Sequence, residues 1–309
     1  MRKKNLTEVE IRNLVDEIVL TYQGDFGINF IDASNLPVRG KILEILDLLF
    51  ELLFPGYTGQ RTVTKSNVNY IIIDIVCHVY TELCEQIERA YKYRCRMEKC
   101  DTGDCRAMAE EATQHLLTQL PKIRELLKGD VAAAFDGDPA AKSYEEVVMS
   151  YPCITAIATQ RIAHELYLKQ VPLIPRIMTE YAHSKTGIDI HPGAKIGRNF
   201  FIDHGTGVVV GETAVIGNNV RFYQGVSLIA ERIPKNAQSI KGAKRHPTVE
   251  DDVTVYAEAT ILGDVTIGKG AVVGANAWIG ESVPPGVTVT TAKPEVVIKH
   301  HNKRKKQNN

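Results

Sequence analysis

The sequence predicts an α+β protein, in which an α-helical N-terminal domain precedes a parallel β-helix of hexapeptide repeats. Two observations lead to this fold class. The first half, residues 1–186, shows helical periodicity with capping and turn signals. In the second half, residues 187–290, aliphatic residues recur at a spacing of six with glycines and Asn-Gly-type turns between them. A spacing of six is typical of short strands joined by tight corners, whose inward side chains stack from coil to coil.

Seven helices are expected in the first half. Thr7 and Glu10 form a capping box that opens the first helix. Ser143 and Glu146 form a second capping box, and the Asp-Gly-Asp-Pro sequence at 136–139 indicates a turn. The apolar face of the first helix carries Val9, Ile11, Leu14, Ile18 and Val19. The other helices are predicted near residues 39–53, 67–95, 106–128, 143–150, 153–169 and 172–184.

Two aliphatic columns run through the second half and predict about five coils between residues 188 and 285. One column has Ile190, Ile196, Ile202, Val208, Ala214, Val220 and Val226, and it resumes from Val249 to Ile279. A companion column runs four residues behind it, from Val253 to Val283. The polar segment 229–247 interrupts the repeat, and we expect it to leave the coil as a loop on one face.

Composition excludes several classes of function. Lys plus Arg and Asp plus Glu each total 37, so no bulk charge points to nucleic acid or to a membrane. The N-terminal segment lacks an apolar stretch typical of a signal peptide, and no run of about 18 apolar residues is present. We therefore expect a cytoplasmic protein, with a basic, solvated C-terminal tail at residues 291–309.

The six cysteines predict neither a zinc site nor a disulfide framework. Cys95, Cys100 and Cys105 are each separated by four residues, whereas zinc knuckles typically have gaps of two. A cytoplasmic chain keeps its thiols reduced.

His204 is the candidate base of a catalytic site. It lies six residues before Val210 and twelve before Ile216, which predicts that it occupies a column slot otherwise filled by aliphatic residues. A lone histidine there could be a satisfied core residue. The adjacent Asp203 and the upstream Asp189 favour function, because a carboxylate that accepts the Nδ1 proton leaves Nε2 free as a base.

Metal-dependent hydration is the other chemistry considered for this kind of coil. It calls for two histidines separated by four residues, and His191, His204 and His246 contain no such pair. The sequence therefore predicts no metal site.

Four segments together resemble serine O-acetyltransferases. They are Gly187-Ile-Asp-Ile-His-Pro-Gly-Ala-Lys-Ile-Gly, Ile202-Asp-His-Gly-Thr-Gly-Val-Val-Val-Gly-Glu-Thr-Ala, Lys244-Arg-His-Pro and Asp138-Pro-Ala. The resemblance covers roughly residues 136–290. It implies a left-handed β-helix that transfers acetyl from acetyl-CoA to L-serine in a ternary complex, the first step of cysteine biosynthesis. It also implies a homotrimer or a dimer of trimers, with active sites between subunits.

Roles for individual residues follow from the same resemblance. It implies that His204 is the general base and that Asp189 orients it. It further implies that Asp138 and Asp203 hold the serine ammonium, while Arg245 and the adjacent His246 grip the carboxylate. This fits the chemistry, because an α-amino acid needs an anion for its amine and a guanidinium fork for its carboxylate.

For the acetyl-CoA site, the resemblance implies three residues, and two lysines are further candidates. The resemblance implies that Ala257, Gly274 and Ala275 lie near the pantetheine arm, where small side chains permit close approach. The insertion at 229–247 replaces a shorter turn of many relatives, so Lys241 and Lys244 are the candidates to pair with CoA phosphates.

The C-terminus differs from relatives that end in isoleucine and dock into cysteine synthase. This chain ends Lys-Lys-Gln-Asn-Asn, so we expect no stable complex with that enzyme. Feedback inhibition by cysteine is expected from the resemblance. Alternatives are acetyl transfer to homoserine, a sugar or an antibiotic, and a non-catalytic scaffold that regulates cysteine synthase.

Overall fold

The computed structural model describes residues 6–23, 28–31, 36–98 and 104–292. The chain divides into two compact units, Met1–Asn35 and Leu36–Asn309. Most of the basic tail, from residue 293 onward, and Cys100 lie outside the described residues. The helical half ends with α7 at Thr186 and the first strand starts at Asp189. The domain limits derived from the sequence stay predictions.

The first unit contains the helix α1, Glu8–Leu20. Its capping box is confirmed: the Glu10 amide donates to the Thr7 hydroxyl, and the Thr7 amide donates to the Glu10 carboxylate. The five apolar side chains predicted on one face of α1 are all exposed, from 42% for Ile18 to 67% for Val9.

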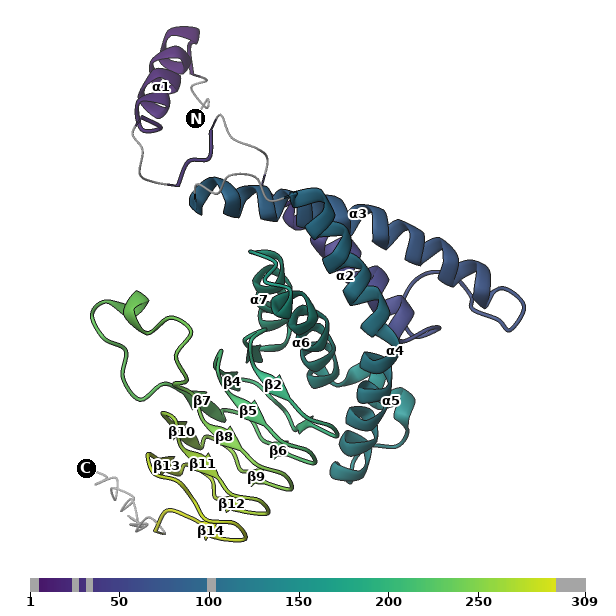
Figure 1. The fold of residues 1–309 in the computed structure, drawn as a ribbon, viewed down its shortest axis with the longest axis vertical. Helices are drawn as coiled ribbons and strands as arrows, with labels where there is room; N and C mark the ends of the chain where they lie inside the picture. Colours follow the sequence, from purple (N-terminus) through teal and green to yellow (C-terminus); the bar gives the residue numbers. More distant parts are fainter. Residues whose placement is uncertain (1–5, 24–27, 32–35, 99–103, 293–309) are drawn as a thin grey trace, which may run out of the picture. The chain divides into compact units, whose positions relative to one another are not determined.

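The second unit opens with the helices α2 to α7, and the coil follows them (Figure 1). These helices are α2 (Arg39–Leu53), α3 (Val68–Glu98), α4 (Cys105–Gly137), α5 (Tyr144–Ser150), α6 (Pro152–Leu168) and α7 (Ile174–Thr186). The helix expected to end near residue 128 continues to Gly137, because Val131 and Ala134 bury their side chains in the core and Asp130 is held by an ion pair. None of the described helices is long and apolar enough to cross a membrane.

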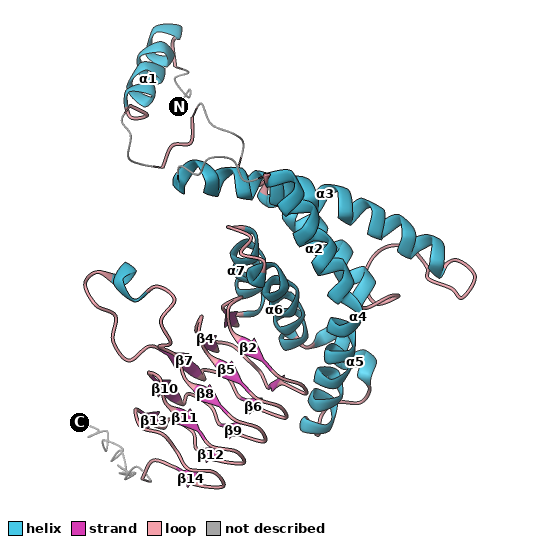
Figure 2. Cartoon of the chain, viewed as in Figure 1, coloured by secondary structure: helices cyan, strands magenta, loops and turns pink. Residues whose placement is uncertain are grey.

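The second half folds into a three-sided coil in which every paired strand is parallel to its neighbours (Figure 2). Its three sheets have the orders β1-β4-β7-β10-β13, β11-β8-β5-β2 and β14-β12-β9-β6-β3, in agreement with about five coils. The first turns contain β1 (Asp189–Ile190), β2 (Lys195–Ile196), β3 (Phe201–Ile202), β4 (Val209–Val210), β5 (Val215–Ile216), β6 (Arg221–Phe222) and β7 (Ser227–Ile229). The later turns contain β8 (Thr248–Val249), β9 (Thr254–Val255), β10 (Thr260–Leu262), β11 (Thr266–Ile267), β12 (Val272–Val273), β13 (Trp278–Ile279) and β14 (Thr288–Val289).

One predicted aliphatic column is wrong in its continuation past Ile202. Ile202 of β3 is followed eight residues later, not six, by the inward side chain Val210 of β4. Val208 instead belongs to the companion column with Ala214, Val220 and Val226, all of which are buried. Two extra residues therefore lie within segment 203–207. They are accommodated by positive φ angles at His204, Gly205 and Gly207.

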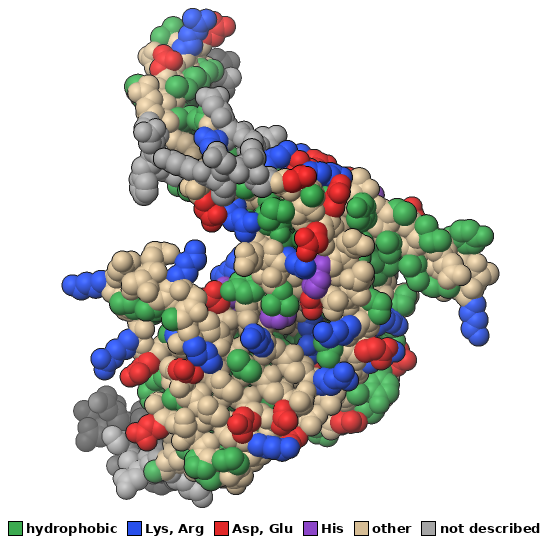
Figure 3. All heavy atoms as spheres, in the orientation of Figure 1, with side chains coloured by type: hydrophobic (Ala, Val, Ile, Leu, Met, Phe, Trp, Pro, Cys, Tyr) green, Lys and Arg blue, Asp and Glu red, His purple; other side chains and the backbone are tan. Residues whose placement is uncertain are grey.

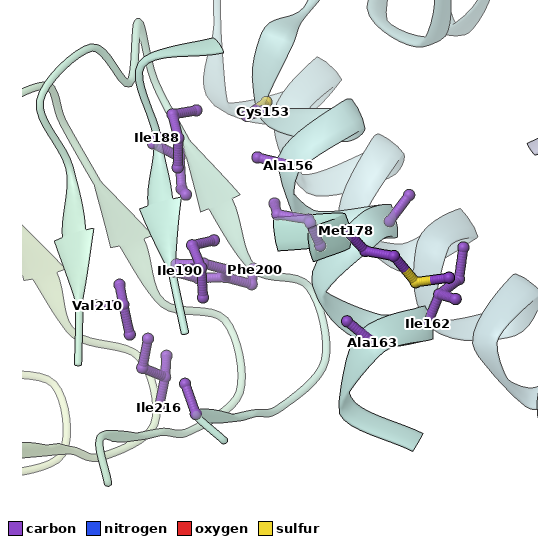
Figure 4. Close-up of a cluster of buried hydrophobic side chains, with 14 of the residues drawn as sticks. Cys153, Ala156, Ile162, Ala163, Met178, Ile188, Ile190, Phe200, Val210 and Ile216 are labelled. Atoms are coloured by element: carbon purple, nitrogen blue, oxygen red, sulfur yellow. The ribbon is translucent and has the colours of Figure 1, made fainter. Parts of the chain in front are cut away.

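Helix α6 packs against the first coil of the β-helix. Small side chains on α6, including Ala156 and Ala163, belong to the same buried cluster as Phe200 and Ile188 of the coil (Figure 4). Gln160 Nε2 donates to the Ala194 carbonyl at 2.8 Å. These contacts fix the start of the coil against the helices.

The interruption of the repeat does leave the coil as a loop, with the short 3₁₀ helix η1 (Ala237–Ile240) near its tip. Every residue from 231 to 239 is exposed. Lys and Arg side chains stand along the outer edge of this loop (Figure 3), and Arg232, Lys235 and Lys241 belong to it. The insertion thus adds a basic projection between β7 and β8.

Candidate active site

The segment 203–207 forms an enlarged corner between β3 and β4. His204, Gly205 and Gly207 have φ angles of 58°, 84° and 82°. A Cβ on Gly205 would lie 2.5 Å from Ile188 Cδ1, so glycine is required there for both conformation and space. The prediction that His204 fills an inward column slot is wrong. The two extra residues turn its side chain outward, and 73% of that side chain is exposed.

A cavity of about 280 Å³ lies beside this corner. It is lined by Asp203 and His204 from the coil and by Asp138 from the end of α4. His204 Nε2 lies 3.8 Å from Asp203 Oδ1. Three of the residues predicted for the site are therefore brought together, although Asp138 is far from the other two in sequence.

Tyr151 holds the Asp138 carboxylate in place. Tyr151 Oη donates to Asp138 Oδ2 at 2.5 Å, and the Ala140 amide donates to Asp138 Oδ1 at 2.8 Å. The hydrogen bond from Tyr151 is the largest cause that lowers the pKa of Asp138, and it raises the pKa of Tyr151 itself. At neutral pH the cavity therefore presents a carboxylate to a cation.

Asp189 lies on β1, paired in register with Val209, the first residue of β4. The Gly207 amide donates to the Gly187 carbonyl, so the enlarged corner lies directly over the segment that leads to Asp189. Among the described residues, no hydrogen bond joins Asp189 to His204. The orienting role of Asp189 stays a prediction.

Arg245 and His246 end the inserted loop between β7 and β8, and they pack against a different corner, the one between β4 and β5. There Arg245 pairs with Glu212, whose other oxygen accepts a hydrogen bond from Tyr167 Oη at 2.9 Å. Burial raises the pKa of Glu212, but the hydrogen bonds from Arg245 and Tyr167 outweigh this and leave the pKa below its usual value. The guanidinium of Arg245 is thus held by a charged carboxylate.

His246 is locked into the same corner. Its Nδ1 accepts from the Thr213 amide at 3.1 Å, and both backbone amides of Arg245 and His246 donate to Thr213 Oγ1. A Cβ on Gly211 would lie 2.1 Å from the His246 ring, so the absence of a side chain at Gly211 makes room for it. Burial lowers the pKa of His246 to about 4, so the ring is neutral at pH 7. Because Nδ1 accepts a hydrogen bond, the proton of the neutral ring is on Nε2.

The predicted pantetheine residues share one edge of the coil with His204. The register of β6, β9 and β12 aligns Gln224, Ala257 and Ala275 in successive coils, and the Gly225 amide, which donates to the Thr206 carbonyl, places Thr206 of the His204 corner at the start of this row. Gly274 precedes Ala275 and is buried. At about 4.8 Å for each coil, the row extends roughly 14 Å from Thr206 to Ala275.

The two predicted phosphate-binding lysines differ in their surroundings. Lys241 is exposed on the loop. Lys244 donates to the Thr213 carbonyl at 3.0 Å and to the His246 carbonyl, and it lies 3.6 Å from Asp264. Lys244 therefore fastens the base of the loop to the coil.

No group of three or more His, Cys, Asp or Glu side chains able to hold a metal occurs among the described residues.

Comparison with known proteins decides the family. Residues 246–281 match the model of the bacterial transferase hexapeptide (six repeats). A serine acetyltransferase from Synechococcus elongatus is 44% identical over 263 residues, which cover 84% of this chain and 82% of the relative. The chain belongs to the serine acetyltransferase family.

Solved structures of serine acetyltransferases are similar to this chain. Serine acetyltransferase isoform 3 from Entamoeba histolytica, in complex with cysteine, is 35% identical with a TM-score of 0.71, over 94% of this chain and 95% of that one. Serine acetyltransferase from Neisseria gonorrhoeae, in complex with serine, is 27% identical with a TM-score of 0.53, over 86% of this chain and 100% of that one. The predicted fold class, a helical part followed by a left-handed β-helix, is confirmed, and so is the prediction of a CoA-dependent acyltransferase.

Sequence reasoning missed several residues that position the site. Glu212 and Thr213 stand inside the segment that resembles serine acetyltransferases, so that segment already contained a signal for them. Tyr151 and Tyr167 carry no such signal. Their hydroxyls reach Asp138 and Glu212 only through the packing of helix α6 and the residue before it against the coil.

Proposed function

We propose that this chain is a cytoplasmic serine acetyltransferase that moves the acetyl group of acetyl-CoA to the hydroxyl of L-serine, without a metal, as the first step of cysteine biosynthesis. The observation that carries the proposal is the shared cavity of Asp138, Asp203 and His204. Two carboxylates and an exposed imidazole there match the ammonium and the hydroxyl of one small amino acid. The serine complex of the Neisseria relative supports the choice of acceptor.

In the proposed mechanism, the serine ammonium lies between Asp138 and Asp203. The imidazole of His204 takes the hydroxyl proton as the serine oxygen attacks the thioester carbonyl, and the CoA thiolate leaves. Asp189 orients the ring. General-base assistance of this kind is worth roughly 10²–10⁴-fold in rate.

The acetyl donor is proposed to lie along the edge of the coil below His204. Ala257 and Ala275 stand in line with Thr206 of the His204 corner on that edge, and Gly274 precedes Ala275 in the chain. Small side chains there let an extended pantetheine arm approach the backbone. Lys241, exposed on the basic loop, is the better placed of the two lysines to meet CoA phosphates, because Lys244 is already bonded to backbone carbonyls.

We further propose a homotrimer, or a dimer of trimers, with serine sites between subunits. Within one chain, His204 stands at the corner between β3 and β4, whereas Arg245, just before β8, pairs with Glu212 at the corner between β4 and β5. Threefold association can bring the first corner of one chain to the second corner of its neighbour. That arrangement would add a guanidinium for the serine carboxylate to the cavity of Asp138 and Asp203.

Two consequences for regulation follow from the proposal. Cysteine is expected to compete with serine, and the cysteine complex of the Entamoeba relative supports this. We also propose that the chain forms no stable complex with cysteine synthase.

The test follows release of free thiol from acetyl-CoA with L-serine, with L-homoserine and with no acceptor. We expect serine-dependent release, and a loss of at least 100-fold in turnover for His204→Asn. The matched control is His183→Asn on α7, a half-exposed histidine beside Glu180, which should keep normal turnover. Release with homoserine but not serine, or normal turnover in His204→Asn, would reject the proposal.

A further inference from the structure

Two cysteine side chains meet where α3 gives way to α4. Cys95 lies in the last turn of α3, and Cys105 is the first residue of α4. Their sulfur atoms are 3.7 Å apart, although the residues are ten positions apart in sequence. Both side chains are partly buried, so small molecules can still reach them.

The distance is that of a thiol–thiol contact, and a disulfide bond needs about 2.05 Å between sulfur atoms. The two sulfurs therefore have to approach by less than 2 Å. Each thiol is carried by a single rotatable χ1 bond, and both cysteines lie at helix ends next to the connecting segment. Closing the gap calls for side-chain rotation and a small shift at those ends, while the packed bodies of α3 and α4 stay in place.

Among the described residues, the other three cysteines have no cysteine in such contact. Cys77 and Cys84 are both on α3 and are seven residues apart, which separates them by about 10 Å along the helix axis. Burial raises the pKa of Cys105 as well as those of Cys84 and Cys153, but Cys84 and Cys153 are fully buried, whereas the Cys105 side chain stays partly accessible to an oxidant. Among the described thiols, the contact between Cys95 and Cys105 is therefore the one suited to oxidation.

We propose that Cys95 and Cys105 form a reversible disulfide that ties the end of α3 to the start of α4, with a low-molecular-weight disulfide as the oxidant. One cysteine thiolate attacks a sulfur of the oxidant, forms a mixed disulfide and releases one small thiol. The second cysteine thiolate then attacks the protein sulfur of that mixed disulfide and releases the second small thiol. The two cysteines lose two electrons and two protons in total, and the oxidant becomes two thiols.

The bond would close a short ring across a part of the chain that already holds several ion pairs. Glu88 of α3 pairs with Lys92 at 2.6 Å and with Arg106 of α4 at 3.4 Å, next to the two cysteines. The disulfide would add a covalent link to this polar cluster. It would restrain separation of α3 and α4 without touching the cavity at His204, so the inference stands independently of the proposed function.

The experiment uses the full chain, reduced, freed of reductant and incubated in mixtures of reduced and oxidised glutathione. Remaining thiols are trapped at low pH, and the digest is mapped by mass spectrometry. We expect one internal disulfide that joins Cys95 to Cys105, with the loss of two hydrogens, and at least tenfold more of it than of any other cysteine pair. Added dithiothreitol should reverse it.

Variants separate this pair from the alternatives. Cys95→Ser and Cys105→Ser should each abolish the two-hydrogen loss, and Cys95→Ala provides a second variant should the serine destabilise the helix end. Cys77→Ser on the same helix is the matched control and should retain the bond, as should Cys100→Ser. Loss of the bond in Cys100→Ser, its persistence in Cys95→Ser, or formation of glutathione adducts alone in the wild-type chain would overturn the proposal.

Discussion

Arg161 of α6 donates two hydrogen bonds to the carboxylate of Asp130 on α4, at 2.8 and 2.9 Å. Both side chains are almost completely buried, at 4% and 0% exposure. Asp130 also accepts from the Phe200 amide, and Arg161 also donates to the Gly197 carbonyl. One ion pair therefore links two helices to the first coil of the β-helix.

Arg161→Leu should lower the free energy of unfolding by about 3–5 kcal/mol, because it leaves a buried carboxylate without its partner. Urea unfolding at fixed protein concentration measures this. The control is Arg176→Leu, which removes an exposed pair with Glu180 on α7 that is worth less than about 1 kcal/mol. Equal effects of the two substitutions would contradict the structural role of the buried pair.

Tyr151→Phe should weaken the proposed binding of serine and change its dependence on pH. Loss of one hydrogen bond of about 0.5–1.5 kcal/mol predicts a two- to tenfold higher KM for serine. Because the Tyr151 hydroxyl lowers the pKa of Asp138, its removal raises that pKa, and the carboxylate becomes protonated at a higher pH. The acid limb of kcat/KM for serine should therefore move to higher pH.

The control for that experiment is Tyr144→Phe. The ring of Tyr144 packs on Phe135 and is half exposed. Its acid limb should coincide with that of the wild type. An unchanged acid limb in Tyr151→Phe would show that the hydrogen bond to Asp138 has no influence on substrate binding.

Gly205→Ala should disturb the corner that carries His204. A left-handed conformation costs a residue with a Cβ about 1–2 kcal/mol, and here the Cβ would also collide with Ile188. We expect a lower melting temperature and a large loss of turnover. Gly280→Ala, at a position with open space around the added Cβ, should be close to neutral in both measurements.

Acid should destabilise the protein through two neutral histidines. Burial lowers the pKa of His191 and His246 to about 4 for each. An unfolded chain binds these protons near pH 6.5. Between pH 6.5 and 4 the unfolded state therefore holds more protons, and stability falls as the pH falls, by at most about 3 kcal/mol for each ring.

Unfolding free energies measured from pH 7.5 to 4.5 test this expectation. His246→Gln should have a shallower acid slope than the wild type, whereas His183→Gln, at a half-exposed position, should leave the slope unchanged. Identical slopes in all three proteins would rule out His246 as a source of acid sensitivity.

Periodicity predicted most of the fold because it reflects local geometry. The capping box of Thr7 and Glu10 and the spacing of six residues both follow from where neighbouring backbone groups must lie. The same pattern assigned Val208 to the wrong aliphatic column. A constant spacing of six cannot include the two extra residues of segment 203–207, which Gly205 and Gly207 accommodate with positive φ angles. The exposed position of His204 follows from that insertion.

The sequence predicted the individual residues of the candidate site, but it did not predict which of them lie together within one chain. Asp138, Asp203 and His204 share a cavity because the end of α4 packs beside the corner after β3. Arg245 stands apart with Glu212 at the next corner. Sequence spacing does not separate the cavity residues from the pair of Arg245 and Glu212, because the distances between these side chains depend on how the helices pack against the coil.

The sequence by itself determined the two kinds of backbone structure, the position of the inserted loop and the residue types of the candidate site. These are local properties, set by hydrophobic spacing, turn residues and short motifs. Only the tertiary structure decided that α4 runs on to Gly137, that Tyr151 lowers the pKa of Asp138 and that Cys95 meets Cys105. Each depends on burial or on contact between segments separated along the chain, and a side chain acquires such partners only when the helices and the coil pack together.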